Sequence, residues 1–297
     1  MDGERLYGRG VLDTKGGLAA AMLVAASFAD GELAGDLIVA AVADEESGSI
    51  GTEALVREWS ADGAVVLEPT DLQVIASHRG FAVVEATVRG RATHTSRADR
   101  GANAVHEAVK VVTAVQALDA AWAAGDPDPV CRPTVMVNRL HSESELFTVP
   151  ARCALTIEMR TTGSAAEQQV RQVIDAVRAA SPAVVECSLV MQRAPLAQPA
   201  DHLLATALQR AAAQNDVDST VAAAPYWTDA ALHSGVGTPA VVFGPSGEGL
   251  HEDVEWVTID SQRRCEATLR TLARQWCGPG QPGRPGRPVR PDLSGTR

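Results

Sequence analysis

The sequence predicts an α/β fold: a mostly parallel sheet with helices on both faces, into which a smaller α+β domain is inserted. Near both ends of the 297-residue chain, continuous apolar runs of strand length alternate with segments of helical periodicity, which is the order of a parallel sheet. Between residues 78 and 195, apolar and polar residues alternate singly, as in half-exposed antiparallel strands. Residues 1–77 and 196–277 are therefore predicted to form one domain, and residues 78–195 the inserted one.

Helices and strands should alternate in the first domain. Apolar residues recur at helical spacing over residues 14–30, whereas residues 36–43 (DLIVAAVA) form a continuous apolar run of strand length. The later segments predict, in order, a helix over 49–59, a strand over 63–69, a strand over 238–247 and a closing helix over 260–276. In such a sheet, functional groups gather where the strands end, so the residues after each strand are candidates for a site.

The inserted domain has a different pattern. Residues 80–92 and 151–163 alternate apolar and polar side chains with a period of two, which predicts antiparallel strands. Two helical patterns follow these strands in turn, over residues 101–123 and 164–180. Strands on one side and two helices on the other make a ferredoxin-like α+β domain.

Composition limits the class of protein. Hydrophobic residues make up 45% of the chain, yet no apolar stretch approaches the ~20 residues of a membrane span. The amino terminus has neither an apolar core nor a basic amphipathic pattern, so the sequence predicts a cytoplasmic protein without contact to a membrane. Five cysteines occur without a C-x-x-C pair, which argues against a disulfide framework or a zinc ribbon.

The chain is acidic, with a net charge of −11. Residues 278–297 are rich in Pro and Gly and hold four Arg and one Asp, which leaves a charge of −14 on the preceding residues. A body of that charge is not expected to bind nucleic acid. The composition of residues 278–297 predicts a disordered extension without a function of its own.

Four acidic residues and one histidine stand where the first domain would gather them. Asp13 lies in the motif GRGVLDTKGG, and the pair Glu45 and Glu46 follows the first predicted strand. Glu68 follows the next strand, and His251 comes shortly after the last one. Carboxylates clustered without Lys or Arg raise one another's pKa and destabilise the fold, and a bound divalent cation relieves this repulsion.

The mixture of carboxylate and imidazole groups suits zinc, with cobalt or manganese as alternatives. Two such ions about 3.5–4 Å apart can polarise a carbonyl and generate hydroxide from water at neutral pH, while an acid beside them serves as general base. Charges on a solvated loop are the ordinary explanation for adjacent acids. The order of the motifs along the chain, rather than the acids alone, favours the metal site.

Five motifs occur together in one order: GRGVLDTKGG, DEESGSIGTEAL, LEPT, GRATHTSRADRGANAV and GPSGEGLHEDVEW. In these motifs and their approximate spacing, the chain resembles the M20 metallopeptidases from residue 3 to about residue 276. That family includes acetylornithine deacetylase, succinyl-diaminopimelate desuccinylase, aminoacylase and carboxypeptidase G2. The resemblance implies a zinc-dependent hydrolase that cleaves an amide bond of a small N-acyl amino acid or dipeptide.

The resemblance also implies roles for the five residues named above. Asp13 resembles the carboxylate that bridges two divalent ions. Glu46 and His251 resemble further ligands of one ion, and Glu68 resembles a ligand of the other. Glu45 resembles the general base, which takes a proton from the attacking water and passes it to the leaving nitrogen.

In the inserted domain, the resemblance points to three more residues. His94, in THTS, resembles a histidine that stabilises the oxyanion, often in the active site of a partner subunit. Asn103 and Arg160 resemble residues that hold the substrate carboxylate, a task for which a guanidinium group is suited. Proteins of this family usually dimerise through the inserted domain and close it over the substrate, so a homodimer is expected.

One departure from the family pattern concerns the second ion. In the family, an earlier strand ends in His-x-Asp, and its histidine binds the ion that Glu68 would hold. Here Met1 comes after that point, so either the start was assigned too late or the chain is truncated. Asp13 and Glu68 alone would make a weak or empty site, and His78 and His233 are poor substitutes.

A second departure concerns specificity. The family has paired glycines and an asparagine where this chain has Ser142, Ser144 and Phe147, which leaves the acyl group of the substrate open. Both departures are also compatible with an alternative function. The chain would then be a non-catalytic remnant with an incomplete di-metal site, which retains the fold and the dimerising domain.

Overall fold

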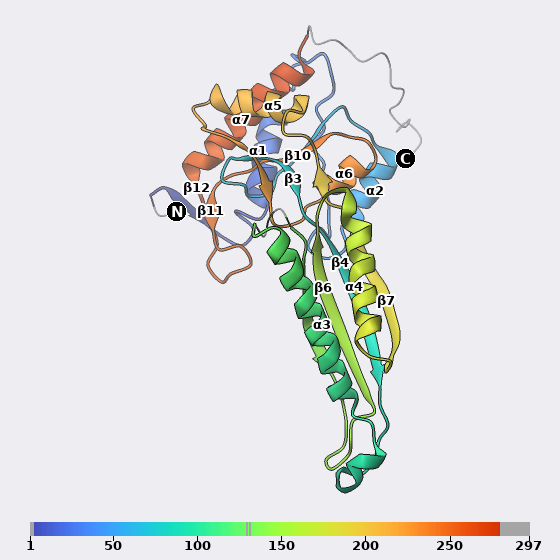
Figure 1. Ribbon diagram of the computed structural model, residues 1–297. Coiled ribbons are helices and arrows are strands. Elements are labelled where there is room, and N and C mark those ends of the chain that lie inside the picture. Colours follow the sequence, from blue (N-terminus) through green and yellow to red (C-terminus); the bar gives the residue numbers. More distant parts are fainter. Residues whose placement is uncertain (1–2, 129, 131, 280–297) are drawn as a thin grey trace, which may run out of the picture. The chain divides into compact units, whose positions relative to one another are not determined.

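The computed structural model describes residues 3–128, 130 and 132–279, which form two compact units (Figure 1). One unit consists of three stretches: the chain up to Ser77, Gln198–Ala223, and the chain from Thr228 onward. The other consists of two stretches: His78–Ala197 and Ala224–Trp227. The predicted α/β class with an inserted α+β domain is confirmed. From residue 280 onward, the predicted disordered extension lies outside the described residues.

A five-stranded sheet has the order β2-β10-β3-β8, with β9 also paired to β3, and all of its strands except β8 lie wholly or mainly in the first unit. Its strands are β2 (Ala64–Val66), β3 (Val74–His78), β8 (Leu196–Ala197), β9 (Val221–Ala224) and β10 (Ala240–Val242). β10 runs parallel to β2 and antiparallel to β3. A small antiparallel sheet has the order β1 (Arg5–Tyr7), β12 (Trp256–Thr258) and β11 (Gly247–Glu248). This second sheet brings the start of the chain beside a segment near its end.

The helices of this unit are α1 (Lys15–Ala26), α2 (Ile50–Glu58), α5 (Leu203–Ala213), α6 (Ala230–Gly235) and α7 (Ile259–Cys277). α7 packs against both α1 and α5. Phe243, Leu208 and Val74 are fully buried in the shared core, where each such side chain contributes about 1.5–3 kcal/mol. The core therefore provides a firm base for the loops that connect these elements.

The prediction of a strand over residues 36–43 is wrong. This segment is assigned to no strand, and the side chains of Ile38 and Val42 are 53% and 42% exposed. An apolar run becomes a strand only where a neighbouring backbone supplies hydrogen-bond partners, and no strand within the described residues pairs with it. The end of the segment is instead tied to α2, because the Ala43 carbonyl accepts a hydrogen bond from the Gly51 N–H at 3.2 Å.

The second unit contains an antiparallel sheet in the order β5-β6-β4-β7. Its strands are β4 (Gly80–Arg89), β5 (Thr134–His141), β6 (Arg152–Thr161) and β7 (Val184–Arg193). Its helices are η1 (Thr95–Arg100), α3 (Ala104–Gly125), η2 (Gly163–Ala165) and α4 (Ala166–Ala180). α3 and α4 pack side by side on the sheet (Figure 1). Buried residues alternate along β6 and meet both helices in a second core, as the period of two predicts.

No helix in the described part of the chain is long and apolar enough to cross a membrane. Cys153, Cys187, Cys265 and Cys277 are free thiols, while Cys131 lies outside the described residues. Burial raises the pKa of the Cys265 thiol to about 12. This thiol is therefore a packing group rather than a reactive one.

Candidate metal centre

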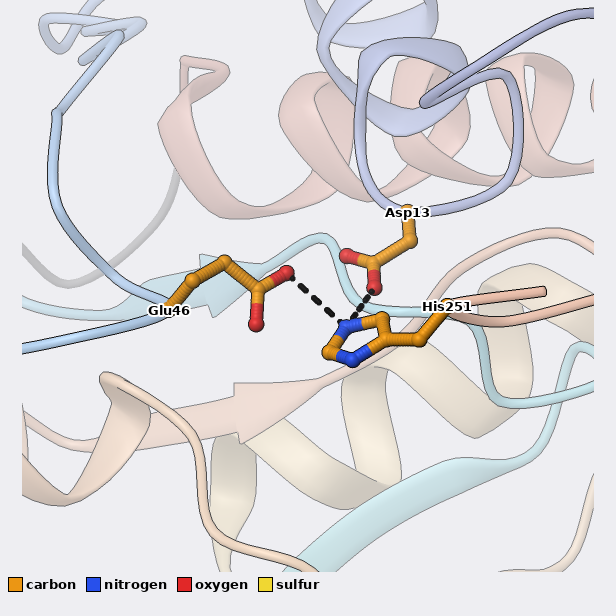
Figure 2. Close-up of side chains that lie close together, drawn as sticks. All are labelled: Asp13, Glu46 and His251. Carbon is orange, nitrogen blue, oxygen red and sulfur yellow. Dashed lines mark hydrogen bonds and ion pairs between the residues drawn. The ribbon is translucent and has the colours of Figure 1, made fainter. Parts of the chain in front are cut away.

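Three side chains from three loops of the first unit meet at one point (Figure 2). Asp13 lies between β1 and α1, Glu46 just before α2, and His251 between β11 and β12. The His251 Nε2 atom is 3.1 Å from Asp13 Oδ2 and 3.2 Å from Glu46 Oε1. Ligand atoms that share one tetrahedral zinc ion lie ~3.4 Å apart, so these separations suit a common ion.

The backbone turns sharply in two of these loops. His251 has a positive φ of 60°. Two residues earlier, Gly249 has a φ of 92°, and a Cβ atom at that position would lie 1.9 Å from a backbone carbonyl oxygen. Asp44 has a φ of 74°, and its side chain accepts a hydrogen bond from the Gly48 N–H at 3.1 Å. Asp44 therefore turns the loop that leads to Glu46. Such positive φ values at non-glycine residues often occur at functional sites.

Glu45 and Glu68 are two further carboxyl groups near the cluster. Burial, together with nearby carboxylates of which Glu45 acts most strongly, raises the pKa of Glu68 to about 9. Burial and the charges of Asp229 and Glu46 raise the pKa of Glu45 to about 7. Both groups therefore hold protons at pH values at which an ordinary glutamate is ionised.

The cluster is short of positive charge. Burial and the neighbouring Glu46 raise the pKa of Asp13. The charge of Glu46 and then that of Asp13 raise the pKa of His251, which favours the protonated imidazole between the two acids. Two carboxylates and one imidazole are a donor set that fits zinc, and also cobalt or manganese. The residues present therefore fit a divalent cation.

One acid of this region is not apparent from the sequence. Asp229 is 3% exposed and lies directly before α6, where its Oδ2 accepts a hydrogen bond from the Thr52 hydroxyl of α2. Its Oδ1 has no hydrogen-bond partner among the described residues, and its charge raises the pKa of both Glu45 and Glu68. An acid before an apolar helix is ordinary capping sequence. That explains why the motif TDAAL carries no sign of a site.

The three remaining candidate residues lie in the second unit. His94 caps η1 through its Nδ1, and its ring stacks on Phe147 with the centroids 6.3 Å apart. The Asn103 side chain accepts hydrogen bonds from two N–H groups at the start of α3. Arg160 pairs with an acid on its own strand at 2.8 Å. Each side chain is thus oriented by its own unit, and its role toward a substrate stays a prediction.

The two histidines considered for the second ion are placed elsewhere. His78 is buried, and its Nδ1 lies 3.0 Å from the backbone carbonyl of Arg79. His233 lies in α6, where burial lowers its pKa. Among the described residues, neither belongs to the group whose ligand atoms come together.

The sequence model of peptidase family M20/M25/M40 matches residues 1–275. The chain belongs to this family. Acetylornithine deacetylase from Myxococcus xanthus is 30% identical over 285 residues, and the match covers 92% of this chain and 73% of that protein. Acetylornithine deacetylase from Buchnera aphidicola is 25% identical over 176 residues, which cover 58% of this chain and 46% of that protein.

Solved structures share the fold of this M20 chain. Aminopeptidase PepT from Bacillus cereus has a TM-score of 0.75 at 17% identity, over 93% of this chain and 75% of that one. A tripeptidase from Staphylococcus aureus has a TM-score of 0.77 at 20% identity, over 93% of this chain and 74% of that one. The resemblance inferred from the five motifs is therefore confirmed at the level of family and fold.

We predict that the metal-free protein loses stability as the pH rises from about 5 to about 9. Glu45 and Glu68 have pKa values of about 7 and about 9 in the folded chain, against about 4.3 in an unfolded one. The folded state therefore binds more protons across this window, and its stability declines until the pH exceeds the folded pKa values. Urea unfolding in the presence of a chelator at several pH values measures this slope.

Two variants and the addition of a metal ion test whether these acids cause the decline of the unfolding free energy with pH. Glu68→Gln should flatten it, whereas Glu58→Gln, at an exposed acid of α2, should leave it unchanged. Zn²⁺ or Co²⁺ should also flatten it, because the cation displaces the protons. A free energy of unfolding that stays constant or rises between these pH values in the metal-free protein would contradict the prediction.

Proposed function

We propose that this M20 chain hydrolyses an amide bond of a small N-acyl amino acid or dipeptide with the help of two divalent ions, zinc or else cobalt or manganese. The meeting of Asp13, Glu46 and His251 at one point carries this proposal. The 30% sequence identity to an acetylornithine deacetylase supports an N-acyl amino acid as substrate. Membership of a peptidase family keeps a dipeptide as the other substrate class.

The chemistry follows from the positions of the side chains. Four of them would hold the ions: Asp13, Glu46, Glu68 and His251. Such ions, when bound, polarise a carbonyl and lower the pKa of water. Glu45 takes a proton from the attacking water and passes it to the leaving nitrogen. A carboxylate beside the ions that does not bind them can perform both transfers.

We assign substrate binding and dimerisation to the second unit. His94 would stabilise the oxyanion, and Asn103 and Arg160 would hold the carboxylate of the substrate. The sheet of this unit ends in β7, where Val185 and Val190 are 46% and 56% exposed. An apolar edge strand favours pairing with another chain, which supports a homodimer through this unit.

The second ion is expected to bind weakly. Asp13 and Glu68 are the acids assigned to it, and among the described residues no further histidine joins the cluster. A chain that binds one ion and turns over no substrate would fit the alternative function, a non-catalytic remnant that retains fold and dimerisation. Turnover by the metal-loaded protein separates the two.

Glu45→Gln tests the proposed base. Glutamine keeps the size of the side chain but cannot accept the proton, so kcat should fall about 10²–10⁴-fold while bound metal stays constant. Release of the free amino acid from N-acetyl, N-succinyl and N-carbamoyl amino acids and from dipeptides measures turnover. Elemental analysis of the purified protein measures the metal.

Glu58→Gln, at an exposed position of α2, is the matched control and should keep both turnover and metal. Loss of metal from Glu45→Gln would identify Glu45 as a ligand, and undiminished turnover would remove it as the base. If the metal-loaded wild type hydrolyses none of these substrates, the non-catalytic alternative is favoured.

His94→Ala tests the oxyanion donor. Removal of one such donor should lower kcat by about 10²–10³-fold, with no change in metal content, because His94 belongs to the other unit. His106→Ala, at an exposed position in the first turn of α3, is the matched control. Equal rates for His94→Ala and wild type would exclude His94 from the reaction.

A further inference from the structure

Glu255 lies beside the loop that carries Asp13, although it is not one of the candidate ligands. It directly precedes β12, which pairs with β1, and its backbone carbonyl accepts a hydrogen bond from the Gly8 N–H at 3.2 Å. Its side chain is 2% exposed. A buried carboxylate requires donors that replace its lost hydration, so the donors around Glu255 indicate what it does.

Three backbone N–H groups of the Asp13 loop donate to this carboxylate. The Gly10 N–H donates to Oε2 at 2.7 Å, and the Leu12 and Asp13 N–H groups donate to Oε1 at 2.9 and 3.0 Å. The Arg9 guanidinium lies 3.4 Å from Oε2. Successive N–H groups that converge in this way form an anion-binding concavity. Here the bound anion is a side chain of the same protein, and the Asp13 loop is folded around it.

The same contacts tie together two segments that supply candidate ligands. Glu255 and His251 belong to the short segment between β11 and β12. Arg9 strengthens the link, because its Nη2 donates to the Glu252 carbonyl of that segment. The Asp13 backbone is held by Glu255, while Asp13 Oδ2 lies 3.1 Å from His251 Nε2. The Glu255 carboxylate thus links the Asp13 loop to the segment that carries His251.

We propose that Glu255 is a positioning residue of the metal centre, whose carboxylate fixes the Asp13 loop against the His251 segment and sets the separation of the two ligands before an ion binds. The proposal rests on the metal-dependent function above. Glu255 does not bind the ion itself, because both of its oxygens accept hydrogen bonds from backbone N–H groups. A site ordered in advance binds more tightly, since less ordering is required on binding.

Glu255→Gln provides the test. The amide keeps the shape of the side chain but replaces one acceptor oxygen by an NH₂ group, which cannot accept from the loop. The affinity for Co²⁺ should fall about 10–100-fold, as for other residues that orient metal ligands. The visible spectrum of the Co²⁺-saturated protein should also change, because Asp13 is no longer held in place. Circular dichroism and metal-free thermal unfolding establish that the variant is folded.

Two further variants keep the test decisive. Glu252→Gln removes an exposed acid from the same segment and leaves the Glu255 contacts intact, so its Co²⁺ affinity should change by less than about fivefold. Glu255→Asp keeps the charge on a side chain too short to reach all three N–H groups, and its affinity should lie between those of wild type and Glu255→Gln. If Glu255→Gln does not fold, the aspartate variant carries the test.

The outcomes separate this proposal from the proposed function. Wild-type Co²⁺ affinity and spectrum in a folded Glu255 variant would overturn the positioning role, even if that variant is less stable. If wild type binds Co²⁺ and hydrolyses substrate in that case, the proposed function stands and only the role of Glu255 is removed. If wild type does not bind Co²⁺, the metal-dependent function fails and the positioning role fails with it.

Discussion

The first unit depends on one electrostatic constraint: several carboxylates share a small volume in which the protein supplies little positive charge. Asp13 and Glu46 reach the same imidazole nitrogen of His251. Burial, with acids around it, raises the pKa of Glu68 to about 9, and the same causes raise the pKa of Glu45 to about 7. Without a cation, the site must either hold protons or lose stability as they leave. A divalent ion relieves the repulsion and makes use of the same side chains.

This concentration of charge is supported by structure outside the cluster. The positive φ of His251 and of Asp44 costs free energy, and the core around Phe243 supplies the rigidity that sustains it. The pairing of β1 with β12 brings the Asp13 loop to the His251 segment from the other end of the chain. The ligands therefore meet because of sheet pairing and turns, neither of which involves a catalytic side chain.

Sequence patterns predict local structure well and pairing poorly. The helices and the strands with a period of two appear close to their expected positions because their periodicity is encoded within each segment. The strand prediction for residues 36–43 failed because an apolar run does not specify which backbone segment lies beside it. The meeting of Asp13 with His251 could be expected only from the order of five motifs. Asp229 and Glu255 had no such signal, since each acquires its role through partners far away in the sequence.

Two glutamates of this unit show why burial alone does not define a metal ligand. Burial raises the pKa of Glu68 to about 9, and every neighbouring charge that acts strongly on it is an acid. Burial also acts to raise the pKa of Glu255, but hydrogen bonds from the Asp13 loop and the charge of Arg9 bring it below its ordinary value. A cation near Glu68 would remove a large repulsion, whereas the charge of Glu255 is already balanced by N–H dipoles. The donors around each carboxylate thus separate an acid suited to bind an ion from an acid suited to hold the loop that binds it.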